Sequence, residues 1–269
     1  MRVHVDIFIW ATARINILSN RTHTMTLTPY KQTQLVIWIN QLLFFGFLIF
    51  NFQPWMLLFA AIGMYVFGFM SESSLHRYYT HKTYETTVIK EKLLRIFAFL
   101  TGQGATISWV TVHRTHHAFE ETEKDPHSPK HLKWWKIYLA FLPKEYKNNL
   151  VIDLMRKPGW KYFLFENTNY FYMWVVLWVV SYLINFYLFF FIVAGVAMWY
   201  IGTCVVNIST HSHGVKRFPE AVAFNSVIVN FFTGVGNHNN HHKFPKSYTY
   251  SIDKENDPYA WVIKKVLKV

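Results

Sequence analysis

The segment "QTQLVIWINQLLFFGFLIFNFQPWMLLFAAIGMYVFGFM", residues 32–70, contains no Asp, Glu, Lys or Arg. A helix of roughly 20 apolar residues crosses the hydrocarbon core of a bilayer, so this segment is long enough for two such helices. "NFQP", residues 51–54, marks the turn between them, because proline suits the first turn of a helix. The segment therefore predicts a transmembrane hairpin with helices at about 33–51 and 54–72.

A second uncharged block, residues 167–215, predicts another hairpin. Asn185 lies near its centre and marks a turn between helices at about 168–184 and 186–206. All 27 Lys and Arg residues lie outside the two blocks, as expected when basic residues are kept on one membrane face. We therefore expect an all-α, multi-pass integral membrane protein with four transmembrane helices, and with both termini on the cytoplasmic face.

The composition agrees with a membrane protein. Among the 269 residues 19% are aromatic and 16% are charged, against roughly 25% charged in a typical soluble domain. The net charge of +12 does not indicate a nucleic-acid partner, because no basic stripe is interleaved with a soluble fold. The single cysteine, Cys204, excludes an intramolecular disulfide framework and a cysteine-ligated zinc or iron–sulfur site.

The segments outside the hairpins complete the expected organisation. Residues 92–113 are apolar but interrupted by Gly-Gln-Gly at 102–104, which favours a re-entrant or interfacial segment, with a full span as the alternative. Residues 118–166 are charged and are expected to form a polar cap on the cytoplasmic face. The predicted divisions are an N-terminal extension with little structure at 1–30, a membrane domain at 31–250 and a C-terminal tail at 251–269.

Histidines concentrate where the predicted helices leave the membrane. Nine of the 14 histidines fall into four groups, all on the cytoplasmic side. The groups are His76 and His81; His113, His116 and His117; His211; and His238, His241 and His242. In HxxHH the three rings project from one side of a helix, whereas residues five apart, as in the first group, converge only at a helix end or a distortion.

So many imidazoles indicate two metal ions, because a single zinc takes about four ligands. Imidazole suits iron, and iron at an oxygen-activating site is the natural choice where no thiolate cluster exists. Soluble di-iron bundles use Glu-x-x-His motifs, which the histidine groups lack. Asn207, four residues before His211, can reach the same point, although capping the helix is an alternative role. We expect each ligand's second ring nitrogen to be hydrogen-bonded. His4, His23, His131 and His213 are interpreted as ordinary surface residues.

Four motifs resemble those of the integral-membrane fatty acid desaturase family, and in detail those of the delta-9 (stearoyl-type) acyl desaturases. They are "HRYYTH" at 76–81, "HRTHHAFEETEKDPH" at 113–127, "NISTH" at 207–211 and "GNHNNHH" at 236–242. The resemblance implies that the nine histidines bind two iron ions and that Asn207 holds one of them through water. It also implies insertion of a cis double bond into a saturated acyl chain with O2. Zinc would be a substitute for iron in a recombinant protein.

The resemblance leaves the acyl carrier open. Members that act on coenzyme A thioesters carry Arg-Asp before the second motif, whereas this chain has Thr111 and Val112. The expected substrate is a long-chain acyl group, either acyl-CoA or lipid-linked, with electrons from a separate carrier such as ferredoxin or cytochrome b5. Membrane lipid is an expected partner and nucleic acid is not. The alternatives are a lipid hydroxylase on the same scaffold and a non-enzymatic metal-binding membrane protein, which would carry more polar residues within its spans.

Overall fold

The computed structural model describes residues 28–140 and 148–268. Within these ranges the chain is helical and has no β-strand, which confirms the predicted all-α class. The N-terminal extension predicted at 1–30 lies outside the described residues except at its end. There the Thr28 hydroxyl accepts a hydrogen bond from the Lys31 amide, and this cap starts the first described helix.

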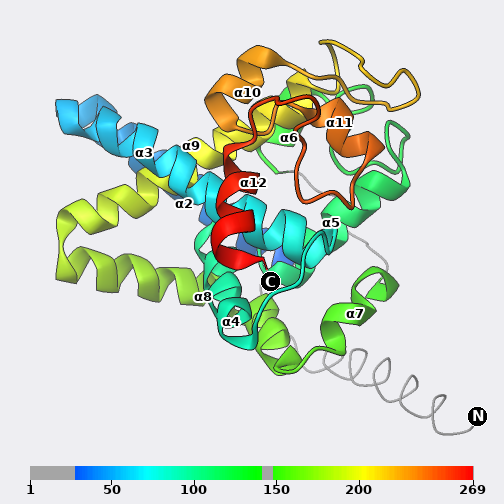
Figure 1. The fold of residues 1–269 in the computed structure, drawn as a ribbon. Coiled ribbons are helices and arrows are strands. Elements are labelled where there is room, and N and C mark those ends of the chain that lie inside the picture. Colours follow the sequence, from blue (N-terminus) through cyan, green and yellow to red (C-terminus); the bar gives the residue numbers. More distant parts are fainter. Residues whose placement is uncertain (1–27, 141–147, 269) are drawn as a thin grey trace, which may run out of the picture.

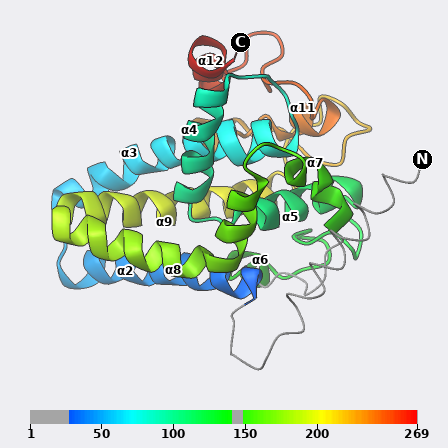
Figure 2. The same cartoon turned by 90° about the horizontal axis from the view of Figure 1, so that it is seen from below.

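Four long helices occupy the segments where spans were predicted. They are α2 (Pro29–Phe50), α3 (Pro54–Ser71), α8 (Trp160–Ile184) and α9 (Phe186–Ser209). The four helices extend toward the same side of the molecule, with α9 packed against the other three (Figures 1 and 2). Asn185 separates α8 from α9, because its side-chain oxygen accepts from the amides of Tyr187 and Leu188 and so caps the new helix.

Three helices are long and apolar enough to cross a bilayer among the described residues. They are α2, the continuous helix Pro54–Thr80 that includes α3, and α9. Helix α8 has 25 residues, which is sufficient length, but its sequence includes two asparagines and several Tyr and Trp residues and is therefore less apolar. These three helices indicate membrane association.

Helices α3 and α9 approach each other closely at a pair of glycines. A Cβ atom added at Gly63 would lie 2.7 Å from the Cα of Gly195, a distance that real Cβ atoms essentially never show. Small residues at helix crossings permit such backbone contact in membrane proteins. The glycine pair therefore sets the spacing of the two helices that lead into the histidine groups.

Gly63→Ala is expected to destabilise the protein by about 1–3 kcal/mol, because the added methyl group pushes α3 away from α9. The measurement is thermal unfolding of the purified protein in detergent. Gly46→Ala is the matched control, since nothing lies within 4 Å of a Cβ at that helical glycine. Equal unfolding midpoints for the two variants would contradict the tight contact.

The remaining helices are short and gather at the opposite end of the four long ones (Figure 2). They are η1 (Glu72–Thr80), α4 (Val88–Leu100), α5 (Thr106–Ala118), α6 (Trp134–Tyr138), η2 (Asn148–Val151), α7 (Ile152–Met155), α10 (Val227–Thr233), α11 (His238–Lys243), α12 (Pro258–Val262) and η3 (Ile263–Leu267). Helices α4 and α5 have 13 residues each and are separated at Gly102, so neither is long enough to cross a bilayer. The alternative of one full span across 92–113 is therefore wrong.

The C-terminal segment packs into this group of short helices. Tyr259, Ile263 and Leu267 are buried, and the Thr86 hydroxyl donates to the Leu267 carbonyl at 2.6 Å. Ile263 and Leu267 share an apolar cluster with residues of η1, α4 and α5. Residues 251–268, which the sequence suggested as a tail, are thus part of the packed structure that surrounds the histidine groups.

Candidate metal centre

The first histidine group lies on a π-helix. In η1 the amide of His81 donates to the carbonyl of His76 at 3.1 Å, which is the i→i+5 bond of this helix type. A π-helix has more residues per turn than an α-helix, so residues five apart face the same side. The distortion that the sequence required is therefore present, and the two imidazole centroids lie 4.9 Å apart.

Five histidines from three separate helices form one cluster. The ligand atoms of this first cluster all lie within 4.8 Å of one another, and its members are His76, His81, His113, His117 and His241. The Nε2 atom of His241 lies 3.2 Å from that of His76 and 3.1 Å from that of His117. The Nε2 atoms of His81 and His113 are 3.1 Å apart.

The other four histidines form a second cluster beside the first. The ligand atoms of His116, His211 and His242 lie within 4.8 Å of one another. The Nε2 atom of His238 lies 3.1 Å from the Nε2 atoms of His211 and His242. The rings of His117 and His242 stack across the boundary, with centroids 4.6 Å apart. The structure thus brings all nine predicted histidines together, in two adjoining clusters.

Carboxylates hold the outer nitrogens of five of these rings. The Nδ1 contacts are His76 with Glu72 at 2.9 Å, His116 with Asp125 at 2.9 Å, His117 with Glu120 at 3.1 Å, His242 with Glu120 at 2.6 Å and His211 with Glu121 at 2.7 Å. A carboxylate at Nδ1 fixes the proton there and leaves Nε2 free as a donor to a metal. The expectation of a hydrogen bond behind every ligand is wrong for His241, whose buried Nδ1 has no hydrogen-bond partner within residues 28–140 and 148–268.

Three of the clustered rings are held in the neutral form. Burial, and after it the neighbouring imidazoles, hold the pKa of His81, His113 and His238 well below its usual range. A neutral imidazole has one N–H and one nitrogen lone pair. Each of these rings therefore offers a lone pair at neutral pH.

The distances between Nε2 atoms in the first cluster are compatible with a bound metal ion. His76 and His117 each donate Nδ1–H to a carboxylate, so both Nε2 lone pairs point at His241 Nε2, which can donate one proton at most. In at least one of these two nitrogen–nitrogen contacts, both nitrogens therefore carry a lone pair and no proton lies between them. Two nitrogens bound at about 2.1 Å to one ion, roughly at right angles, lie about 3.0 Å apart. The observed separations of 3.1–3.2 Å fit a shared cation.

In the second cluster, Nε2 lone pairs also face a shared nitrogen. His211 and His242 each donate Nδ1–H to a glutamate and direct their Nε2 lone pairs at His238 Nε2. In addition, the Nε2 atom of His116 is buried and has no hydrogen-bond partner among the described residues. A cation in each cluster would satisfy these nitrogens, and imidazole donors suit iron, zinc or copper.

His127 lies behind the second cluster and is a site residue that was not predicted from the sequence. Its ring centroid lies 4.2 Å from that of His116, and its own backbone amide donates to Asp125 at 3.1 Å. Burial raises the pKa of Asp125 to about 6 and lowers that of His127 to about 3. The motif Asp-Pro-His at 125–127 was the available signal, since both side chains turn back onto the same ligand.

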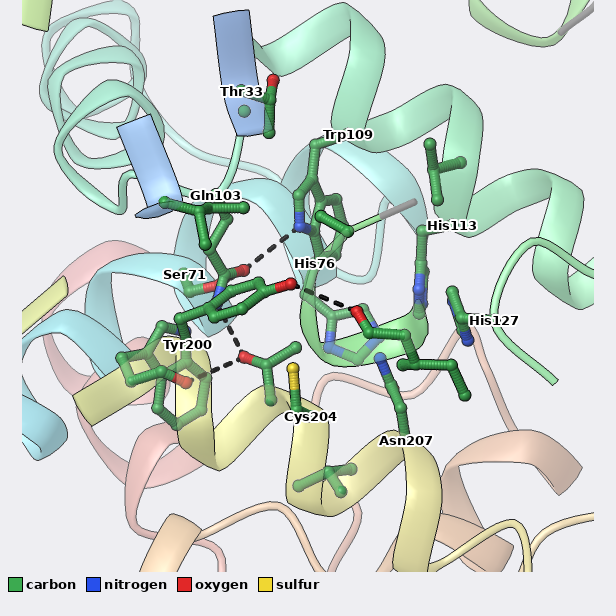
Figure 3. A pocket seen from close by; sticks show the side chains of 18 of the residues that line it. Thr33, Ser71, His76, Gln103, Trp109, His113, His127, Tyr200, Cys204 and Asn207 are labelled. Atoms are coloured by element: carbon green, nitrogen blue, oxygen red, sulfur yellow. Dashed lines mark hydrogen bonds between the residues drawn. The ribbon is translucent and has the colours of Figure 1, made fainter. Parts of the chain in front are cut away.

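A cavity of about 120 Å³ adjoins both clusters. His76, His113 and His238 are among its lining residues. Other parts of its wall come from α5, with Trp109, and from α9, with Tyr200 and Cys204 (Figure 3). Gln103 ties that wall together, because it donates to Thr203 at 2.7 Å and accepts from the Trp109 indole at 3.2 Å. None of the described residues that line the cavity is Lys or Arg. Glu72 is the one acid among the described lining residues, and the rest of the wall is neutral, which suits an uncharged chain next to the nitrogen donors.

Asn207 also lines this cavity (Figure 3). It is half-buried in the last turn of α9, four residues before His211. The helix continues to Ser209 and has Thr210 as its C-cap, so the capping role considered for Asn207 is not observed. Its amide is free to act within the cavity.

Glu120 is the one described acid that contacts a ring of each cluster, through the same Oε1 atom. Glu120→Ala is therefore expected to weaken metal binding at both clusters together, by roughly 10–100-fold each. The measurement is competition for zinc between the protein and a calibrated chelator. Glu123→Ala, at an exposed position three residues away, is the control and should bind as wild type does. Loss confined to one cluster would contradict the shared role.

Known proteins are similar to this chain over most of its length. The profile of the fatty acid desaturase family matches residues 50–265. The sn-1 stearoyl-lipid 9-desaturase of Anabaena variabilis is 26% identical over 91% of this chain and 95% of that protein. The sn-2 palmitoyl-lipid 9-desaturase of Nostoc sp. (strain 36) is 30% identical, with 77% and 79% covered.

A plant relative extends the same likeness. The delta-9 acyl-lipid desaturase 2 of Arabidopsis thaliana is 28% identical over 73% of this chain and 66% of that protein. The match of the family profile to most of the chain agrees with the resemblance of the four histidine motifs. This chain therefore belongs to the fatty acid desaturase family, with delta-9 desaturases as its relatives, and it is an oxidoreductase.

Proposed function

We propose that this protein inserts a cis double bond, at the delta-9 position, into a saturated acyl chain of a membrane lipid. The observation that carries the proposal is the pair of imidazole clusters beside a cavity whose described lining residues include no Lys or Arg. Three relatives are named as desaturases of lipid-linked chains, which favours a lipid over a coenzyme A thioester as the acyl carrier. Thr111 and Val112, in place of a charged pair, agree with that choice.

Two iron ions are proposed as the cofactor, one in each cluster, with zinc as a substitute in recombinant protein. The first ion would be held by members of the group His76, His81, His113, His117 and His241; the second by members of the group His116, His211, His238 and His242. Asn207 would hold one ion through a water molecule. When bound, the irons supply activation of O2 and removal of hydrogen from an unactivated methylene.

The protein's own residues position the reactants. The four acids of the site hold five rings with Nε2 directed inward, and each such contact strengthens the imidazole as a donor. Gln103, Thr203 and Trp109 fix the cavity wall beside the first cluster. This wall would orient the acyl chain and exclude water from the reacting carbons. A separate electron carrier, such as ferredoxin or cytochrome b5, would supply the electrons.

The proposed topology has four spans, α2, α3, α8 and α9, with the metal site and both termini in the cytoplasm. The support is the distribution of Lys and Arg, which lie outside the two uncharged blocks. The turns at Asn51 and Asn185 lie at the end of the long helices away from the histidines (Figure 2). Cysteine labelling from outside the cell should reach Asn51→Cys and Asn185→Cys but not a cysteine at the exposed position Glu123.

Expression in a desaturase-deficient host, followed by fatty-acid analysis, tests the function. Expected products are cis monounsaturated chains with the bond between carbons nine and ten, found first in the intact membrane lipids after pulse labelling. Hydroxylated chains would instead support the lipid hydroxylase. Label appearing first in the acyl-CoA pool would overturn the proposed carrier.

A further inference from the structure

Arg77 is a fully buried cation directly after the first metal-binding histidine. Its Nε donates to Glu72 at 3.3 Å, its Nη2 to Asp257 at 3.0 Å and its Nη1 to the Tyr248 carbonyl at 2.7 Å. The side chains of Arg77, Glu72 and Asp257 are all nearly inaccessible to solvent. A guanidinium is costly to desolvate, so it stays at such a place only with a complete set of partners.

Asp257 connects this cation to the C-terminal segment. Its Oδ2 accepts from the Tyr250 amide at 2.7 Å, and its Oδ1 accepts from the Ala260 amide at 3.0 Å, which starts α12. The Tyr250 ring lies against Arg77, 4.0 Å from centroid to guanidinium carbon. The Tyr250 hydroxyl lies 3.0 Å from His76 Nδ1. Residues 248–257 thus reach His76 by two routes, through Arg77 with Glu72 and through Tyr250.

We propose that Asp257 is a positioning residue for the first histidine cluster, and that residues 248–257 form a latch that holds the His76 ring. The proposal rests on the metal site of the proposed function. Within this segment, Asp257 and the Tyr250 hydroxyl lead to His76 in the first cluster, whereas the acids behind the second cluster come from residues 120–125. The same segment also holds α11 through Asn240, and the substitutions tested below leave those contacts in place. Asp257 forms an ion pair with Arg77, so Arg77 does not pair with Glu72 alone. The Glu72 carboxylate therefore remains able to accept the hydrogen bond from His76 Nδ1–H.

Loss of the negative charge of Asp257 would change how Arg77 pairs with its neighbours. Arg77 would then pair more fully with Glu72, which is the acceptor that fixes the His76 proton. A weaker acceptor at Nδ1 makes Nε2 a poorer donor and lets the ring turn. The backbone amide of Tyr250 would also lose its charged acceptor. That hydrogen bond helps to place the Tyr250 side chain, whose hydroxyl lies near His76.

The test is zinc binding to full-length Asp257→Asn in detergent, measured by chelator competition. We expect one of two zinc ions to bind roughly 10–100-fold more weakly than in wild type, while the other stays within about 2-fold. Asp253→Asn is the matched control, because it removes an Arg–Asp pair from the same segment, with Arg217, at an exposed position. Both zinc ions should bind normally to that variant. Asp257→Glu should restore most of the lost affinity.

Tyr250→Phe decides the question if Asp257→Asn does not fold. It removes only the hydroxyl that contacts His76 and Glu72, and it keeps every ion pair. We expect weaker binding of the same single zinc ion, by a few-fold. Unchanged affinities at both sites, or equal loss at both, would overturn the latch. A wild-type protein that binds fewer than two zinc ions would instead overturn the two-metal proposal itself.

Discussion

His241→Ala is expected to remove one metal ion and to lower desaturation by at least about 1,000-fold, equivalent to about 4 kcal/mol of barrier. His241 Nε2 is the nitrogen that two other ligands of the first cluster face, at 3.1 and 3.2 Å. The side chain is fully buried, so water has little access to replace it as a ligand. Its removal therefore opens the first cluster at its centre.

Two measurements on the same variant check this result. Metal analysis after iron loading should give one ion per chain for His241→Ala and two for wild type. Product analysis in the desaturase-deficient host should find no new unsaturated chains. His213→Ala is the control, because His213 is exposed and lies two residues beyond the ligand His211. A His241→Ala protein with two ions and normal product would contradict the assignment of the first cluster.

The long helices were predictable because apolar length is a local property. Residues 32–70 and 167–215 carry no charge, and the helices α2, α3, α8 and α9 lie there with the turns at Asn51 and Asn185. The start of α8 was not predictable from apolar length, because the charged residues before position 167 are also helical. Helix formation before 167 depends on packing, as buried Phe163 and Glu166 show, and apolar length does not report it.

The histidines were predictable because their spacing fits helices and one distortion. The acids behind them were not predicted, because the Glu-x-x-His pattern describes glutamates that bind a metal directly and not glutamates that lie behind a ligand. Glu72, four residues before His76, was a usable signal, since i and i+4 meet on a helix face. Glu120 contacts His242 from 122 residues away, and Arg77 contacts Asp257 from 180 residues away. Such pairs follow from the tertiary fold, so no local pattern announces them.

Asn207 is proposed to contact a metal ion in a different way from the nine histidines. An amide oxygen is a weaker donor than imidazole, so it suits a position that must open when oxygen enters. Its half-buried side chain faces the cavity that His113 and His238 also line (Figure 3). Because nine imidazoles already surround the two proposed ions, Asn207 is not needed to retain metal.

Asn207→Ala is therefore expected to fold, to hold two iron ions and to lose product formation by roughly 10–100-fold, in the range measured for groups that act through a metal's surroundings. His211→Ala, one helical turn further along, should lose metal as well as product, since its ring belongs to the second cluster. The comparison is made at matched iron content, with product measured per metal-loaded protein. Equal activity of Asn207→Ala and wild type under that condition would show that the amide takes no part in the reaction. A loss of iron in Asn207→Ala as large as that in His211→Ala would make Asn207 an ordinary ligand.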